Sequence, residues 1–220
     1  MKIDLHNHTV FSPDSSSTVE QALEAARAGG MDGIAVTDHN SVRGSLEAEK
    51  KASGAIVVIT GSEVSTSDGH LLCLGIREDV RKGMTMAETI DAVVAMGGIA
   101  VPSHPLRTGT GCGLKLLDSL DIKSIETVNG RNLRSKNRRA AHYASARGLA
   151  CTGGSDSHTP SEIGRAYTLI EGEGLSAEEI VSALSSGKSS AAGDGQGYLG
   201  SGRTMMKIVS EYIRRGRRHI

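Results

Sequence analysis

Short apolar segments rich in β-branched residues alternate with longer segments that have the spacing of amphipathic helices. The strand-like segments are residues 2–8, 33–38, 55–63, 70–76, 99–103, 124–128, 150–155 and 166–170. The helix-like segments are residues 18–28, 42–53, 86–96, 135–147 and 177–185. Strand and helix in regular succession are typical of a parallel sheet covered by helices.

Several strand segments, such as GIAVTD, AIVVITG and GIAVPS, are nearly continuous apolar runs, as expected for strands buried on both faces. We therefore expect one α/β barrel over residues 1–192, with an open doubly wound sheet as the alternative. Residues 193–220 are expected to form a Gly/Ser-rich linker, 193–202, and a basic C-terminal helix, 204–218. Ser17 or Thr18, and Ser176 with Glu179, are expected to begin helices as capping residues.

Composition excludes several classes of protein. Lysine plus arginine and aspartate plus glutamate both number 25, so the overall charge does not call for nucleic acid or an anionic membrane. No apolar run approaches the roughly 20 residues that span a bilayer, and the N-terminus lacks the pattern of a signal peptide. Cys73, Cys112 and Cys151 form no CxxC pair, which favours reduced thiols and a cytoplasmic protein. The oligomeric state is left open.

Polar residues follow the apolar strands at the point where each strand is expected to end. The segments concerned are HNH (6–8), TDHN (37–40), GSE (61–63), SHP (103–105) and SDSH (155–158). In a parallel barrel these strand ends share one face, where such enzymes have their active sites.

His6 and His8 are two residues apart on a strand, so their side chains point to the same side, as do those of Asp156 and His158. Burying several such groups without partners would cost several kcal/mol for each. A metal site resolves this cost, and mixed nitrogen and oxygen ligands suit zinc, manganese or iron rather than calcium. The full set comprises His6, His8, His39, His104, His158, Glu63 and Asp156.

These motifs, in this order, resemble those of the PHP (polymerase and histidinol phosphatase) superfamily, from residue 2 to about residue 170. GSE and IETVNG fit the same pattern. The resemblance implies a distorted seven-stranded β/α (TIM-like) barrel with two or three divalent metal ions and phosphoester hydrolysis as its chemistry.

The resemblance also implies individual ligands. His6, His8, Glu63 and Asp156 would hold the first metal, and Glu63 would bridge to a second that His104 also binds. His39, His158 and Asp14 would hold the third, with Asp14 at a position where many relatives have histidine. His70 is either a further ligand of the second metal or a residue at the rim.

Other polar residues are expected to serve the reaction without binding metal. Asp38, beside a ligand, would orient an imidazole. Arg107 and Arg131 would meet the substrate phosphate, with ordinary surface arginines as the alternative. Asn129 is expected to face the same mouth, and Arg165 is a weaker phosphate candidate. His142 and His219 are expected at the surface.

The leading hypothesis is a metal-dependent phosphoesterase in which activated water, without a covalent serine or cysteine intermediate, attacks a nucleotide, a short oligonucleotide or a small phosphomonoester. The interval between Glu63 and His104 is too short for a large inserted lid. The alternatives are a histidinol-phosphatase-like enzyme, a non-catalytic metal-binding regulatory module, and an amidohydrolase-like enzyme. The arginines of YIRRGRRHI allow a nucleic-acid contact, although a solvated helix is the simpler interpretation.

Overall fold

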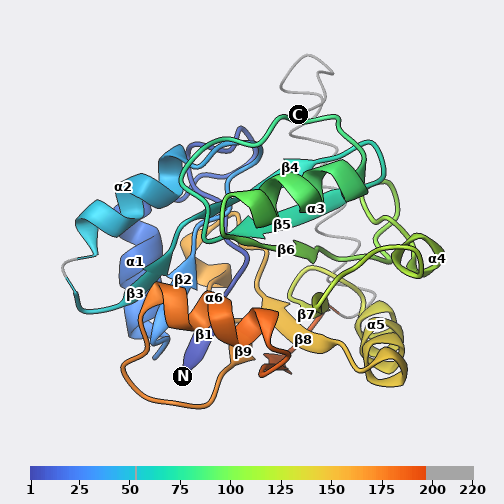
Figure 1. Cartoon of the computed structure of the whole chain (residues 1–220). Coiled ribbons are helices and arrows are strands. Elements are labelled where there is room, and N and C mark those ends of the chain that lie inside the picture. Colours follow the sequence, from blue (N-terminus) through green and yellow to red (C-terminus); the bar gives the residue numbers. More distant parts are fainter. Residues whose placement is uncertain (53, 197–220) are drawn as a thin grey trace.

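Helices and strands alternate along the chain in the computed structural model, which describes residues 1–52 and 54–196 (Figure 1). The strands are β1 (Lys2–Asp4), β2 (Gly33–Ala35), β3 (Val57–Ile59), β4 (Gly61–Ser65), β5 (His70–Leu74), β6 (Ile99–Pro102), β7 (Ser124–Asn129), β8 (Ala150–Gly154), β9 (Ala166–Leu169) and β10 (Ser190–Gly193). The helices are α1 (Val19–Ala28), α2 (Arg43–Lys51), α3 (Met86–Ala95), α4 (Leu114–Leu117), α5 (Arg134–Arg147), α6 (Ala177–Ser185) and a 3₁₀ turn, η1 (Pro160–Glu162). Every segment expected as a strand or helix up to residue 185 contains one.

The expectation of a closed, seven-stranded TIM-like barrel is wrong. In the described residues, backbone hydrogen bonds define three separate sheets. Their strand orders are β10-β9-β1-β2-β3, β4-β5-β6 and β7-β8. The pairs β1–β2, β2–β3 and β7–β8 are parallel, whereas β9 runs antiparallel to β1 and β5 runs antiparallel to both β4 and β6. Nor do the strands of residues 1–52 and 54–196 form one open doubly wound sheet.

One short connection explains why the parallel arrangement fails between β4 and β5. A parallel pair needs a crossover of about a dozen residues or more. Residues 66–69 are the whole connection between β4 and β5, so these strands form a hairpin. The strands of this hairpin are nevertheless buried, because apolar side chains and α3 cover them. The continuous apolar sequence of these strands therefore indicated that they are buried, but it carried no information on whether they run parallel or antiparallel.

Isolated bridges join the strand ends of different sheets. His39 bridges Glu63, and Asn7 bridges Ser157, both in parallel orientation. The amide of Glu63 donates to the carbonyl of Thr37 at 3.1 Å. The motif-bearing segments consequently meet without a closed barrel.

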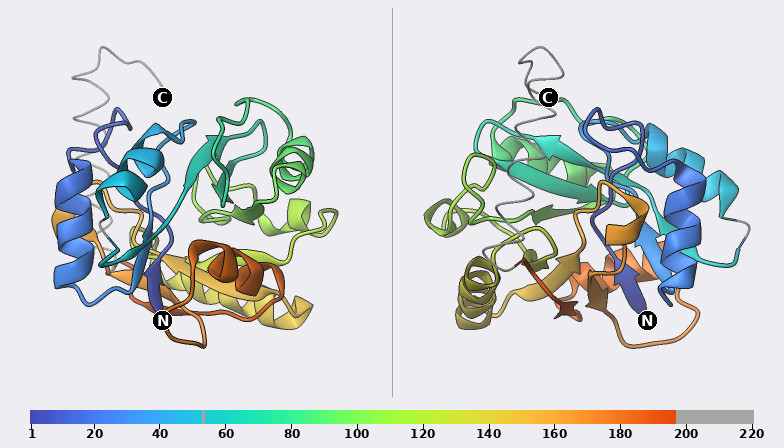
Figure 2. Two further views of the ribbon diagram at one scale, coloured as in Figure 1. Left: turned by 60° about the vertical axis from the view of Figure 1, so that its left-hand side comes forward. Right: turned by 180° about the vertical axis from the view of Figure 1, so that it is seen from behind.

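The helices cover the outside of these sheets. Helices α1 and α2 lie side by side against β2 and β3, and α5 packs on β7 (Figure 2). Thr18 and Ser176 cap α1 and α6 as expected, each in a reciprocal capping box with the residue three positions on. The core is aliphatic, in keeping with a single phenylalanine and no tryptophan.

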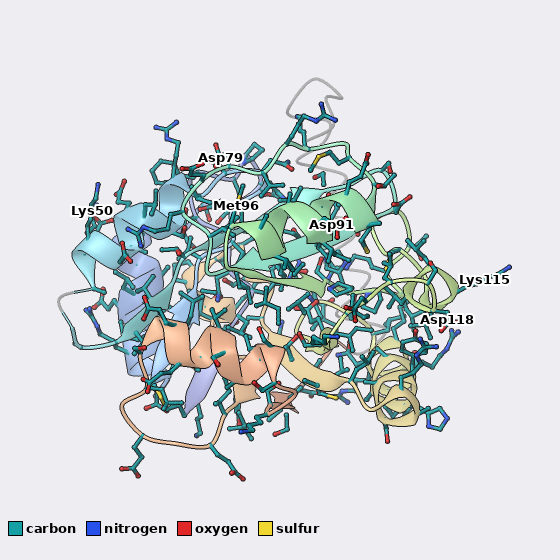
Figure 3. The ribbon with its side chains drawn as sticks, in the orientation of Figure 1. Lys50, Asp79, Asp91, Met96, Lys115 and Asp118 are labelled. Atoms are coloured by element: carbon teal, nitrogen blue, oxygen red, sulfur yellow. The ribbon has the colours of Figure 1, made fainter. Side chains whose placement is uncertain are left out.

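Charged side chains are distributed around the molecule. Lys50 and Lys115, for example, project outward from opposite sides (Figure 3). Cys73, Cys112 and Cys151 are all free thiols, as expected. Among the helices of residues 1–52 and 54–196, none combines the length and the apolar character that crossing a bilayer requires. The division at residue 193 stays a prediction, and the expected helix 204–218 with its arginines lies outside the described residues.

Candidate metal centre

A buried carboxylate, Glu63 of β4, has five imidazoles around it. They belong to His6, His8, His39, His70 and His104. Neighbouring rings in this order have centroids 5.2, 4.5, 5.5 and 5.5 Å apart, and the last and first are 5.7 Å apart. The imidazoles therefore form a closed ring, which we call the histidine ring.

The two oxygens of Glu63 face different members of the histidine ring. Oε1 lies 2.8 Å from Nε2 of His104, 3.2 Å from Nδ1 of His70 and 3.4 Å from Nε2 of His6. Oε2 lies 3.2 Å from Nδ1 of His39 and 3.6 Å from Nε2 of His8. Such a division is what a carboxylate shared by two adjacent metal ions requires.

Asp156 adds a second carboxylate beside the histidine ring. Its Oδ1 lies 3.5 Å from Nε2 of His8 and 3.8 Å from Nε2 of His6. Its Oδ2 instead accepts from Nη2 of Arg107 at 2.5 Å and from Nδ2 of Asn129 at 3.2 Å. One oxygen is thus directed at the imidazoles, and the other is held by the protein.

Asp14 reaches the cluster from a loop rich in serine. Its Oδ2 lies 2.9 Å from Nε2 of His158 and 3.5 Å from Nε2 of His39. The His158 ring lies 4.5 Å from that of His8. The three residues expected to share the third site are therefore adjacent.

Three residues at the site have backbone in the left-handed region without being glycine. They are Asn40, with φ of 56°, His104, with φ of 31°, and Asp156, with φ of 53°. Backbone of this kind costs on the order of 1–3 kcal/mol and persists where surrounding contacts impose it, often at functional sites. Here the conformation directs a side chain of the centre at two of the three positions.

The protonation states of His8, His104 and Glu63 suit metal ligands. Burial opposes protonation of His6 and His39, but nearby carboxylates, Asp156 at His6 and Asp14 at His39, outweigh it and raise the pKa of both rings. Burial, with His158 and His39 nearby, lowers the pKa of His8 to about 3, and burial together with Arg107 lowers that of His104 to about 4. Burial opposes ionisation of Glu63, but His70 and His6 outweigh it, so its pKa lies well below the usual range. Neutral imidazoles and ionised carboxylates are the forms that bind metal.

The residues present fit divalent metal ions. Nε2 of His6, Nε2 of His8, Nδ1 of His39 and Nδ1 of His70 are buried and have no hydrogen-bond partner. Leaving several such atoms unsatisfied is costly, and a cation would satisfy them together. Four groups of three residues have ligand atoms within 4.8 Å of one another. They are His8–His39–His158, His6–His104–Asp156, His6–His8–Glu63 and His39–Glu63–His70.

The residues expected to serve the reaction without binding metal lie either behind the histidine ring or at its edge. Asp38 lies behind the histidine ring, where it accepts from the Thr9 amide and the Ser12 hydroxyl, both at 2.7 Å. The Ser12 hydroxyl in turn lies 3.2 Å from Nδ1 of His8. Arg107 and Arg131 are partly exposed beside Asp156 and His158, respectively.

Arg165 and His142 lie outside the centre. Arg165 is exposed, and its side chain lies beside Gly130 rather than among the imidazoles. His142 is exposed on α5, as expected. His219 lies outside the described residues.

Glu126 is the main site residue that sequence reasoning missed. It lies within β7 and contacts Nδ1 of His6 at 2.9 Å. The available signal was a charged residue inside the expected strand 124–128 rather than at its end. Ser12 and Ser103 were also missed, and Ser103 donates to Oε1 of Glu63 at 2.8 Å.

Comparison with known proteins places these residues in context. A family model for the PHP domain matches residues 4–104, and a model described as PHP-associated matches residues 134–189. An uncharacterised protein of Methanocaldococcus jannaschii is 37% identical over 142 residues, 59% of this chain and 82% of that protein. The phosphoribosyl 1,2-cyclic phosphate 1,2-diphosphodiesterase of Eggerthella lenta is 37% identical over 82 residues, 34% of this chain and 31% of that enzyme.

Solved structures share the fold. A two-domain protein of Bacteroides vulgatus, containing a predicted PHP-like metal-dependent phosphoesterase, superposes with a TM-score of 0.74 at 20% identity. The match covers 88% of this chain and 64% of the Bacteroides chain. A lesion-specific endonuclease of Pyrococcus furiosus superposes with a TM-score of 0.63 at 17% identity, over 86% of this chain and 57% of the endonuclease.

Proposed function

The chain belongs to the PHP family of metal-dependent phosphoesterases, and from this premise we propose that it hydrolyses a phosphoester bond at the histidine ring. The observation that carries the proposal is the position of Glu63, whose two oxygens face different imidazoles of the ring. Divalent metal ions bound there would neutralise phosphate oxygens and lower the pKa of a water molecule for attack on phosphorus. Zinc, manganese and iron suit this mixture of imidazole and carboxylate ligands.

We assign the ligands as follows. His6, His8, Glu63 and Asp156 would hold one ion, and Glu63 with His104 and His70 would hold a second. Asp14, His39 and His158 would hold a third. His70 is assigned as a ligand rather than a rim residue because its Nδ1 is buried, unpaired and 3.2 Å from Glu63.

The protein's own residues orient these ligands. Ser103 donates to Glu63, and Ser12 connects Asp38 to His8. Arg107 and Arg131 lie at the edge of the centre, where a guanidinium can pair with phosphate oxygens. Arg107 also fixes the outer oxygen of Asp156.

The charge near the site supports a nucleotide or short oligonucleotide as the substrate. Helix α5 begins three residues after Arg131 and carries Arg138 and Arg139, which are exposed and make no ion pair with any described residue. Together with His142 and Tyr143 they line a surface depression of about 560 Å³. Basic side chains on a helix that begins close to a hydrolytic site can hold further phosphates of an oligonucleotide.

A screen of the metal-reconstituted protein tests the reaction. The protein, loaded in turn with manganese, zinc and iron, is assayed with p-nitrophenyl phosphate, bis-p-nitrophenyl phosphate, nucleoside bisphosphates, short oligonucleotides and histidinol phosphate. We expect hydrolysis of phosphoesters in wild type and its loss in Glu63→Gln, with Glu173→Gln as a control at an exposed glutamate away from the histidine ring. Absence of hydrolysis with every metal and substrate would indicate a non-catalytic metal-binding module, and preference for histidinol phosphate would favour the histidinol-phosphatase alternative.

The arginine substitutions separate substrate binding from chemistry. Arg131→Ala should raise KM for a phosphoester at least tenfold, because it removes a cation beside the reacting phosphate. The double substitution Arg138→Ala with Arg139→Ala should weaken the binding of an oligonucleotide and leave the hydrolysis of p-nitrophenyl phosphate unaffected. Equal losses for both substrates would contradict a role for α5 in binding distal phosphates.

A further inference from the structure

Glu126 is a second buried carboxylate, positioned behind the histidine ring. It lies in the middle of β7 and is 2% exposed. Its Oε1 lies 2.9 Å from Nδ1 of His6, and its Oε2 accepts from the amide of His104 at 2.7 Å and from Nδ2 of Asn129 at 2.9 Å. We propose that Glu126 is a positioning residue that sets the orientation of His6 and the backbone of His104 for metal binding, an inference that rests on the proposed function.

The contact with Glu126 selects one tautomer of the His6 imidazole. A carboxylate only accepts hydrogen bonds, so the nitrogen facing Glu126 carries the proton. The other nitrogen, Nε2, is then the ligand atom, and it is the one that lies 3.4 Å from Glu63 without a hydrogen-bond partner. A carboxylate that accepts from a histidine's outer nitrogen fixes the ring and makes it a better ligand.

The contact with His104 supports strained backbone. The φ of 31° at this residue is unfavourable for any side chain that has a Cβ atom. Its buried amide donates to Glu126 at 2.7 Å, so the carboxylate satisfies a donor that no strand pairing reaches. The same residue therefore acts on two imidazoles that approach Glu63 from different strands.

Asn129 extends the contact to Asp156. Its Nδ2 donates to both Glu126 and the outer oxygen of Asp156, while its Oδ1 accepts from Arg107 and from the amide of Arg131. A register shift between Glu126 and Val128 interrupts the pairing of β7 with β8, and irregularities of this kind redirect side chains. Glu126 is thus tied directly or through one amide to three assigned ligands.

Glu126→Gln tests the role at nearly constant volume. Three donors converge on Glu126, but glutamine offers one oxygen, so at least one buried donor faces its amide group. We expect the affinity for zinc, measured by competition titration of the full chain, to fall about 10- to 100-fold. Thr127→Val is the matched control, because this buried neighbour on β7 contacts the Thr152 carbonyl and not the cluster.

A second measurement avoids dependence on how well the variant folds. In zinc-loaded, ¹⁵N-histidine-labelled wild type, we expect Nδ1 of His6 to carry the proton, with assignment from a His6→Asn spectrum. An unprotonated Nδ1, or Glu126→Gln that binds zinc as tightly as wild type, would overturn the role of Glu126 alone. Wild type that binds no metal would instead refute the proposed function.

Discussion

At the scale of single residues, the centre depends on how closely the residues behind it can pack, as well as on which residues are its ligands. Asp38 packs against the start of α2, where Gly44 leaves room for its carboxylate. A Cβ atom at position 44 would lie 2.0 Å from Oδ2 of Asp38 and 2.9 Å from Oγ1 of Thr9. The absence of a side chain there lets Asp38 hold Thr9 and Ser12, and through Ser12 the ring of His8.

Gly44→Ala should therefore destabilise the protein. Alanine is favoured over glycine within a helix by up to about 1 kcal/mol, so helix propensity alone predicts the opposite sign. The overlap with a buried carboxylate should cost on the order of 1–3 kcal/mol and reduce the metal content. Urea unfolding and elemental analysis check both effects, and a stabilised Gly44→Ala protein would contradict this account of Asp38.

At the scale of elements, the antiparallel hairpin β4–β5 brings Glu63 and His70 together. These residues are diagonal neighbours in register, since Glu63 is paired to Leu72 and His70 is paired to Ser65. Alternation along the strands puts the two side chains on one face, where they approach to 3.2 Å. A parallel crossover at this point would have placed His70 at the far end of its strand.

Helix α3 covers β6 of the same sheet and begins at a capping box formed by Thr85 and Glu88. Thr85→Ala should lower the free energy of unfolding by about 1 kcal/mol, because the Glu88 amide loses its acceptor. Since α3 supplies no residue to the centre, metal content should stay at the wild-type level. Urea denaturation with Thr85→Ser as the conservative control measures the effect, and full stability in Thr85→Ala would show that the cap contributes nothing.

At the scale of the whole molecule, metal binding should couple to folding, since the assigned ligands come from segments scattered between residues 6 and 158. An ion that binds the folded chain alone, at 100 times its Kd, adds about 2.7 kcal/mol to the free energy of unfolding. For a protein of this size that corresponds to roughly 5–11 °C in Tm. Removing metal with a chelator should therefore lower Tm by that amount.

Calorimetry with and without chelator measures this shift in wild type and two histidine variants. His104→Asn should lose most of the metal-dependent increase in Tm, because it removes a ligand assigned to the ion shared through Glu63. His142→Asn, altered at an exposed position on α5, should retain it. Equal shifts in both variants would mean that the metal acts elsewhere.

The sequence by itself located most of the elements, although not α4 or β10, and most of the side chains that meet at the centre. Periodicity located the strands and helices, since side-chain spacing reflects local geometry. Seven motif residues were expected to converge because they follow buried strands, and the family resemblance added Asp14 and His70; all nine side chains lie at one centre. The motif residues come together whether neighbouring strands run parallel or antiparallel, provided that the strand ends meet.

Tertiary structure alone decided the direction of the strands and the contacts behind the ligands. A buried strand is apolar whether it runs parallel or antiparallel, so the expected barrel could not be distinguished from three separate sheets. The partner of a buried charge is set by packing, which is why Glu126 gave no sign in the sequence that it faces His6 and His104. The choice of imidazole nitrogen at His6 likewise follows from that long-range contact, and spacing along the chain does not encode it.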